Sequence, residues 1–269
     1  MKERLAIAII SGCLCMSAAN AATPEFVKDG DLNICTTAAF PPMTYNENSS
    51  AKSPIGIDID IATELAKRWN ATITYSVTEF SGLLPTLGSG RCDLIISGIY
   101  VTDKRREVYD AVKYMKSATV AVVGARNEDI RTPDDLSGKS LALEAGTYYR
   151  EERVDPLNKS LAAAGKEPVK AEDYPTQQAA YQQVIVGRAD ATLTEEAEGA
   201  FRVAQSGDQL RISYTWPSDF SYGIYMRRDG NSIGDIRALL LELSKDGFFE
   251  KLAKKYGLDP SVFAVDYKS

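Results

Sequence analysis

The 269-residue chain contains no histidine. This absence excludes Ser-His-Asp and Cys-His nucleophile systems and every metal site that depends on an imidazole ligand. The sequence also lacks the GxxxxGK[ST] and GxGxxG loops that hold phosphate groups. Any catalysis would therefore have to use carboxylate, lysine, tyrosine or arginine side chains, and no feature of the sequence requires a cofactor or a metal ion.

Long apolar runs are missing as well, except near the N-terminus. Residues 5–18 form an uncharged, mostly apolar run that follows two basic residues and precedes Ala19-Asn20-Ala21. This arrangement predicts a cleaved secretory signal peptide over residues 1–21. The run is shorter than the roughly 20 residues of a membrane-spanning helix. The alternative is a lipoprotein signal with an acylated Cys13, which would leave a very short apolar run before the cut.

Cysteine is scarce, because removal of residues 1–21 leaves only Cys35 and Cys92. Both lie in apolar segments that are typical of strands. We predict two buried free thiols that fill space in the core. The alternative is a disulfide between neighbouring strands, which an oxidising compartment would allow.

The charge balance narrows the range of partners. The chain has a net charge of −6, with charges of both signs dispersed along it. Such a chain is a poor match for nucleic acid or for an anionic membrane surface. The length that remains after cleavage suits one large or two small domains.

Strand and helix patterns alternate through most of the sequence. The first series predicts strands at 32–37, 71–77 and 92–99, helices at 59–69 and 80–90, and a further helix from Asp103. A long strand pattern at 118–124 separates it from a second series. That series predicts strands at 139–145, 169–174, 190–194, 210–215 and 222–228, with helices at 147–165, 176–187, 195–205, 232–247 and 248–257. This alternation is typical of an α/β fold with parallel sheets.

The two series form similar halves, joined by extended segments near 118–124 and 216–225. We therefore predict a first lobe made of residues 22–118 and 224–269. The second lobe is predicted at 119–223, including the hinge segments. In open α/β sheets, strand ends and helix N-termini face a crevice where ligands bind. This organisation predicts hinge closure on a small molecule.

Six segments, in this order and spacing, resemble the bacterial extracellular solute-binding proteins of family 3, which bind polar amino acids. They are GIDIDIATELAKRW, EFSGLLPTLGSGRCDLIISGIYVTDKR, TPDDLSGKSLALEAGTYY, GRADATLTE, YGIYMRR and DGFFEKLAKKYG. The resemblance covers residues 30–258. It implies a type II periplasmic-binding-protein fold, each lobe a mostly parallel sheet flanked by helices. It also implies a periplasmic monomer that binds a small amino acid or amino-acid derivative and passes it to the permease of an ABC importer.

Arg105 is the residue that, by this resemblance, grips the ligand's α-carboxylate, with main-chain help from Gly98 and Tyr100. The planar guanidinium can pair with a carboxylate through two parallel hydrogen bonds. Backbone N–H groups at the start of a helix add further donors. The alternative is a solvated arginine beside Lys104 and Arg106.

Glu195 takes the place of the acid that binds the ligand's ammonium group, which is more often aspartate in the family. The residue directly follows the strand pattern at 190–194 and precedes a helix. The longer side chain shifts the carboxylate by a bond length and could favour another set of ligands. The alternative role is a favourable negative charge in the first turn of a helix.

Further contacts are implied by the same resemblance. Thr147 and Tyr148 match the anion contact of the second lobe, where Thr147 can also cap the following helix. Phe40 and Phe80 match rings that sandwich the ligand, although both could simply be core aromatics. Thr37 stands where cation-specific members often have aspartate, which argues against a lysine or arginine ligand.

An enzyme of the same fold is the main alternative. The segment TEEAE at 194–198 resembles the part of periplasmic cyclohexadienyl dehydratases that carries a general acid, and Glu198 matches that acid. A carboxylic acid kept neutral in a dry pocket could protonate a departing hydroxyl group. However, Thr119 stands where that family has an active-site lysine, and Phe40 and Phe80 replace its tyrosine and tryptophan.

Overall fold

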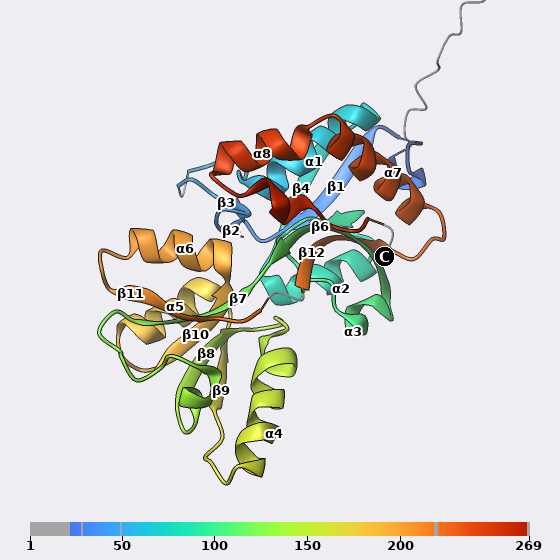
Figure 1. Ribbon diagram of the computed structural model, residues 1–269. Coiled ribbons are helices and arrows are strands. Elements are labelled where there is room, and N and C mark those ends of the chain that lie inside the picture. The colour runs from blue at the N-terminus through green and yellow to red at the C-terminus, as the bar shows by residue number, and fades with distance from the viewer. Residues whose placement is uncertain (1–21, 28, 49, 218–219, 268–269) are drawn as a thin grey trace, which may run out of the picture.

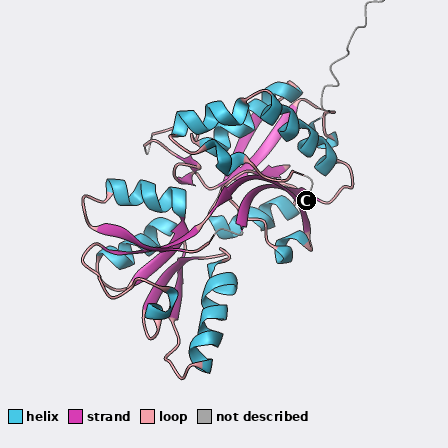
Figure 2. Ribbon diagram, viewed as in Figure 1, coloured by secondary structure: helices cyan, strands magenta, loops and turns pink. Residues whose placement is uncertain are grey.

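The computed structural model describes residues 22–27, 29–48, 50–217 and 220–267. The predicted signal peptide and Cys13 lie outside these residues. Two five-stranded sheets form two lobes, seen at the upper right and lower left of Figure 1. Helices cover both faces of each sheet (Figure 2). The prediction of a two-lobed α/β fold is therefore confirmed.

The sheet of the first lobe has the order β4-β1-β5-β12-β6. The strands are β1 (Asp31–Thr36), β4 (Thr72–Val77), β5 (Leu94–Ile95), β6 (Tyr109–Ser117) and β12 (Phe220–Arg227). The helices of this lobe are α1 (Ile57–Trp69), α2 (Leu83–Gly88), α3 (Asp103–Arg106), α7 (Ser232–Lys245) and α8 (Phe248–Tyr256). A short hairpin of β2 (Ala39–Phe40) and β3 (Thr44–Tyr45) lies beside them.

The sheet of the second lobe has the order β11-β7-β10-β8-β9. Its strands are β7 (Thr119–Gly124), β8 (Ser140–Glu144), β9 (Lys170–Tyr174), β10 (Ala191–Glu195) and β11 (Leu210–Thr215). Its helices are α4 (Asp155–Ala163), preceded by a π-helical turn over Arg150–Val154, α5 (Gln177–Ile185) and α6 (Glu196–Gln205).

Both sheets are mixed rather than mostly parallel. β1 runs parallel to β4 and β5, whereas β12 is antiparallel to β5 and β6. In the second lobe β8 runs parallel to β9 and β10, and β7 is antiparallel to β10 and β11. The antiparallel pairs arise where the chain crosses between the lobes, from Ser117 to Thr119 and from Thr215 to Phe220. The crossing from β6 to β7 lies at the interface between the lobes (Figure 1).

Apolar spacing explains how the helices pack on the sheets. In α1 the buried residues Ile57, Ile61, Leu65 and Trp69 recur every four positions and form one face. That face packs into the core of the first lobe with Leu32 and Ile34 of β1, as expected for an amphipathic helix. The helix follows Gly56, whose φ of 131° and close approach to the Met43 carbonyl leave no room for a side chain.

Two predicted elements differ from the structure. The helix expected from Asp103 ends at Arg106, and the next residues form β6, which the sequence analysis missed. The buried residues Ala111, Val112, Tyr114 and Met115 lie in a strand that pairs with β12, and this tertiary pairing overrides the helical pattern. The strand expected at 92–99 is reduced to Leu94–Ile95, because the chain turns at Gly98, whose φ is +56°.

The prediction of two free thiols is wrong, because Cys35 and Cys92 form a disulfide. Their Cα atoms are 5.8 Å apart. The backbone bond from the Asp93 N–H to the Asn33 carbonyl (2.8 Å) holds the two segments side by side. Both sulfurs lie in the core and are fully buried. The pairing depends on this three-dimensional neighbourhood, which the spacing of two cysteines does not reveal.

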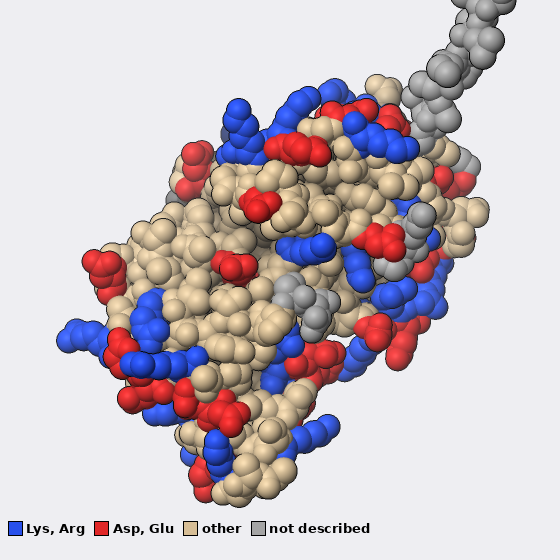
Figure 3. All heavy atoms as spheres, viewed as in Figure 1, with Lys and Arg blue, Asp and Glu red and all other residues tan. Residues whose placement is uncertain are grey.

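The surface carries mixed charge. On the face drawn in Figure 3, basic and acidic side chains are interspersed over both lobes, and the region where the lobes meet is mostly uncharged. Among the described residues, no helix combines the length and the apolar character that a membrane span would need.

Candidate functional site

A cavity of ≈ 430 Å³ lies between the two lobes. The first lobe contributes α3 and the start of β6, and the second lobe contributes the turn after β8 and the helix that follows. The lining residues are Leu84, Thr102, Lys104, Arg105, Glu107, Val108 and Tyr109 on one side, and Gly146, Thr147, Tyr148, Glu151 and Glu152 on the other. Three of the predicted site residues, Arg105, Thr147 and Tyr148, therefore meet at this cavity.

Arg105 is held in a fixed position at the interface. The side chain of Thr102 caps α3 by accepting the Arg105 N–H at 3.3 Å. The guanidinium donates from Nη1 to the Tyr100 carbonyl (2.8 Å) and from Nη2 to the Gly146 carbonyl of the second lobe (3.0 Å). Its carbon also lies 5.7 Å from the centre of the Phe80 ring. The structure thus brings together Arg105, Phe80 and the backbone of Tyr100, as the sequence analysis expected.

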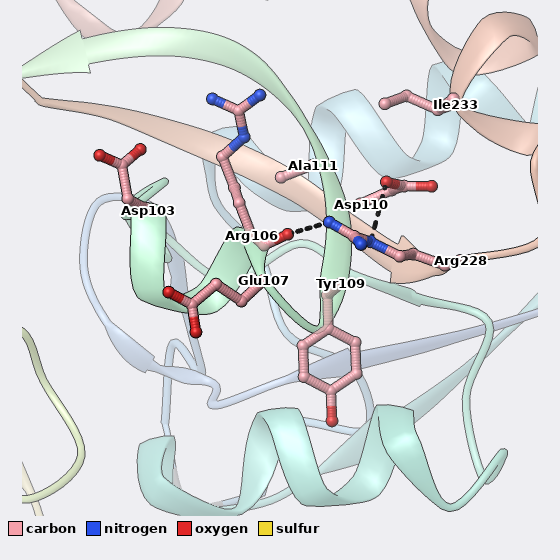
Figure 4. Close-up of a pocket in the computed structure, with 8 residues that line it drawn as sticks. All are labelled: Asp103, Arg106, Glu107, Tyr109, Asp110, Ala111, Arg228 and Ile233. Carbon is pink, nitrogen blue, oxygen red and sulfur yellow. Dashed lines mark hydrogen bonds and ion pairs between the residues drawn. The ribbon is translucent and has the colours of Figure 1, made fainter.

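The neighbouring Arg106 faces a different cavity, formed by the first lobe alone (Figure 4). There Arg228 lies 3.6 Å from Asp110 and also donates to the Arg106 carbonyl. The two adjacent arginines of α3 therefore point in different directions. Arg105 is the one that reaches the second lobe.

Gly98 and Phe40 pack on one another in the first lobe. A Cβ atom at Gly98 would overlap the Phe40 ring. The Phe40 ring lies 6.3 Å from that of Tyr222, edge to face. The rings of Phe40 and Tyr222 form the aromatic wall of the first lobe. Both predicted residues, Gly98 and Phe40, thus lie at this wall.

Tyr100 and Tyr148 form an aromatic contact across the interface, with ring centres 4.7 Å apart. The Tyr148 hydroxyl shares a hydrogen bond of 2.6 Å with the Thr119 hydroxyl. The Phe220 ring lies 4.9 Å from Tyr148 and stacks on Tyr100 at 5.5 Å. These rings give the site apolar walls close to the hinge crossings.

Thr147 does not cap the following helix, so that expectation is wrong. Its hydroxyl donates backward to the Glu144 carbonyl at 2.7 Å. The helix starts later, with the π-helical turn at Arg150–Val154. Thr147 is therefore part of the tight turn that leaves β8, where it lines the inter-lobe cavity.

Glu195 lies deeper than the cavity and does not line it. It ends β10 directly opposite Thr119 of β7 and is only 5 % exposed. Burial raises the pKa of its carboxyl to about 8, while a hydrogen bond from Tyr149 lowers it, the neighbouring Glu198 raises it and Arg105 lowers it. The carboxyl lies close enough to sense the charge of Arg105, and no described cation forms an ion pair with it.

The comparison of this chain with known proteins agrees with the geometry of the site. The sequence matches the profile of the bacterial extracellular solute-binding proteins, family 3, over residues 32–259. The chain belongs to this family.

Relatives in the family cover nearly the whole chain. The probable amino-acid-binding protein YxeM of Bacillus subtilis (strain 168) is 27% identical over 263 residues, which cover 93% of this chain and 90% of the relative. The L-cystine-binding protein TcyJ of Escherichia coli (strain K12) is 27% identical over 256 residues, covering 94% and 92%. The structure of an ancestral arginine-binding protein bound to arginine superposes with a TM-score of 0.76 at 29% identity, covering 84% and 98%. These names describe binding proteins and not enzymes.

Arg153, near the site of this family 3 protein, was missed by the sequence analysis, whereas Tyr149 was among the aromatic residues considered as ligand contacts. Tyr149 faces Glu195, and Arg153 donates from Nε to the Thr119 hydroxyl at 3.0 Å while its guanidinium lies 4.8 Å from the Phe220 ring. The spacing of four between Tyr149 and Arg153 could have placed them on one helical face. Which face turns toward the cleft depends on the turn after β8.

Glu198, the acid of the enzyme alternative, is fully buried beneath the site. Its carboxylate accepts hydrogen bonds from the Thr194 hydroxyl and from Arg202 Nε, the latter at 3.3 Å. Thr119, at the position of the missing lysine, bonds to Tyr148 and Arg153. Glu198 is thus engaged within the second lobe and does not line the inter-lobe cavity.

Proposed function

We propose that this protein binds a small amino acid or amino-acid derivative between its lobes and delivers it to the permease of an ABC importer. The observation that carries the proposal is a basic side chain and an acidic side chain on facing lobes. Arg105 comes from the first lobe and Glu195 from the second, and the carboxyl senses the guanidinium electrostatically. A zwitterion presents the complementary pair of charges.

The carboxylate of the ligand binds to Arg105. The Nη2 group bonds to the Gly146 carbonyl, so the incoming carboxylate competes for this donor. Nη1 stays on the Tyr100 carbonyl and keeps the plane of the guanidinium fixed. A preorganised donor loses little side-chain entropy when it binds a carboxylate.

The ammonium group of the ligand binds to Glu195. The carboxyl is buried and interacts electrostatically with Tyr100 and Tyr148, and a positive charge in such surroundings interacts more strongly than in water. Movement of these rings opens the path from the cavity to Glu195. The Cα of one amino acid then lies between the two anchors.

Closure of the lobes covers the ligand. We infer that the lobe built on the β4-β1-β5-β12-β6 sheet and the lobe built on the β11-β7-β10-β8-β9 sheet move as two bodies about the crossings near Ser117 and Thr215. The closed interface is supported by an ion pair of Lys104 with Glu151 and by the Tyr45–Phe201 ring contact, 5.8 Å between centres.

We also infer that the protein is exported, cleaved after Ala21 and active as a monomer in the periplasm. The buried disulfide of Cys35 and Cys92 supports this, because disulfides persist in oxidising compartments. Mass spectrometry of the secreted protein tests the cut. A mass that retains residues 1–21, or one with lipid on Cys13, would contradict it.

A thermal-shift screen of the twenty common amino acids and of opines tests the function. A ligand at 100 times its Kd stabilises the native state by about 2.7 kcal/mol, which for a protein of this size raises Tm by about 5 to 10 °C. We expect such a rise for a narrow group of amino acids. A flat response to all of them would refute the proposal.

A further inference from the structure

Glu198 lies in the first turn of α6, three residues after Glu195, and is fully buried. The two carboxyls therefore lie on one side of a helix start, and the charge of Glu198 raises the pKa of Glu195. Two buried carboxylates at this spacing repel one another, because the protein interior screens charge poorly. Few positively charged side chains are available to offset this repulsion.

Arg202 is the cation that contacts Glu198, at 3.3 Å from Nε to the carboxylate. The same guanidinium donates from Nη2 to the Ala39 carbonyl at 3.3 Å, and Ala39 belongs to the first lobe. The contact lies next to Phe40 of the aromatic wall. The position of Arg202 beside Glu198 is thus tied to the closed arrangement of the lobes.

Among the residues that the structure describes, no further cation forms an ion pair with either carboxyl. Burial raises the pKa of Glu198 to about 7, and Arg202 lowers it. Burial, together with the charges of Glu198 and Glu195, also raises the pKa of Glu144, at the end of β8, to about 8. The other titratable groups that interact with Glu195 or Glu198 are Arg105 from α3, Tyr149 before the π-helical turn, Tyr181 from α5, Tyr100, Tyr148 and Tyr222.

We propose that Glu198 is a positioning residue that tunes Glu195 for the ligand's ammonium group, and that binding of this group releases a proton from the carboxyl pair to the solvent. The inference rests on the proposed function. In the ligand-free protein the pair holds a proton, because Arg202 can balance only one negative charge. The ammonium supplies the second positive charge, so a carboxyl O–H bond breaks and the carboxylate accepts an ammonium N–H instead.

The absence of histidine removes the most common source of protons near neutral pH. No imidazole can contribute protons near neutral pH, and unperturbed lysine and tyrosine titrate near 10. Asp58 is another buried acid, with a pKa raised by burial to about 7, but it is bonded to Tyr114 in the core of the first lobe. Its environment does not include the ammonium anchor.

The experiment is calorimetric titration at pH 7 in phosphate and in Tris, whose ionisation enthalpies differ. The probe is whichever of the twenty common L-amino acids raises Tm most. We expect the wild type to release about one proton on binding. Its affinity should then increase about tenfold for each unit by which the pH is raised up to pH 7, and should level off above about pH 8. Glu198→Gln keeps the side chain's size and removes its charge, so it should release less than about half a proton.

Glu196→Gln is the matched control, because Glu196 lies in the same turn of α6 but is exposed. It should behave as the wild type. Equal heats in both buffers for the wild type, or unchanged proton release in Glu198→Gln, would overturn the proposal. The wild-type measurement stands even if the variant does not fold. Failure of every amino acid to bind would instead refute the proposed function.

Discussion

Replacement of Arg105 by alanine should weaken ligand binding without unfolding the protein. The guanidinium donates to two carbonyls and rests on Phe80. After its removal the Tyr100 carbonyl still accepts the Tyr225 hydroxyl at 2.7 Å, so no buried acceptor is stranded there. We therefore expect the ligand-free Tm to change by only a few degrees.

The effect on affinity should be much larger. Removal of one partner of a hydrogen-bonded charge pair costs about 2 to 5 kcal/mol. At about 1.4 kcal/mol per factor of ten, this corresponds to an increase in Kd of about 30- to 4,000-fold. Isothermal titration calorimetry with the ligand from the thermal-shift screen measures it.

Two control variants separate the binding of the ligand's carboxylate by Arg105 from other effects. Arg106→Ala removes the adjacent arginine, which faces the cavity of the first lobe in Figure 4, and should leave Kd within about twofold. Lys104→Ala removes the exposed ion pair with Glu151, which contributes about 0.2 to 1 kcal/mol to closure, or at most about fivefold in Kd. If Arg105→Ala binds within threefold of the wild type, the assignment of the carboxylate anchor is wrong.

Three further predictions concern charge and the disulfide. Glu195→Gln should raise Kd by about 10- to 150-fold in calorimetry, since a charged hydrogen bond contributes about 1.5 to 3 kcal/mol; unchanged affinity would remove Glu195 from the site. Because burial raises the pKa of Glu195 to about 8 and that of Glu198 to about 7, the folded state binds more protons than the unfolded state. Stability should then fall between pH 5 and pH 8, by about 1.4 kcal/mol per unit for each protonated carboxyl; a ligand-free Tm that rises over this range would contradict the burial of these groups. The double variant Cys35→Ser, Cys92→Ser opens a link across 57 residues and should lower the free energy of unfolding by about 4 kcal/mol in urea titrations; an unchanged midpoint would show that the link does not restrain the unfolded chain.

The sequence predicted most of the fold because apolar periodicity decides where strands and helices can bury a face. The helix of α1 and the strands β4, β7 and β10 lie within a residue or two of the predicted ranges. β6 was missed because the helix start at Thr102 is a strong local signal. Its pairing with β12 joins residues more than a hundred positions apart, and local patterns do not contain it.

The candidate site was predicted in part. Arg105 follows the predicted strand at 92–99, and Glu195 follows the predicted strand at 190–194. Such strand ends converge at the interface between the two sheets. Arg153 and Arg202 escaped notice because their roles depend on which helical face turns toward the other lobe. The disulfide escaped for a similar reason, since the distance between two cysteines follows only from strand order.

Calorimetry with the identified amino acid and two analogues tests the central claim most directly. One analogue replaces the ammonium group with a hydroxyl, and the other replaces the carboxylate with an amide. If Arg105 and Glu195 hold the two charges of a zwitterion from facing lobes, each analogue should bind at least about 30-fold more weakly than the parent. Equal affinity of either analogue would contradict the account.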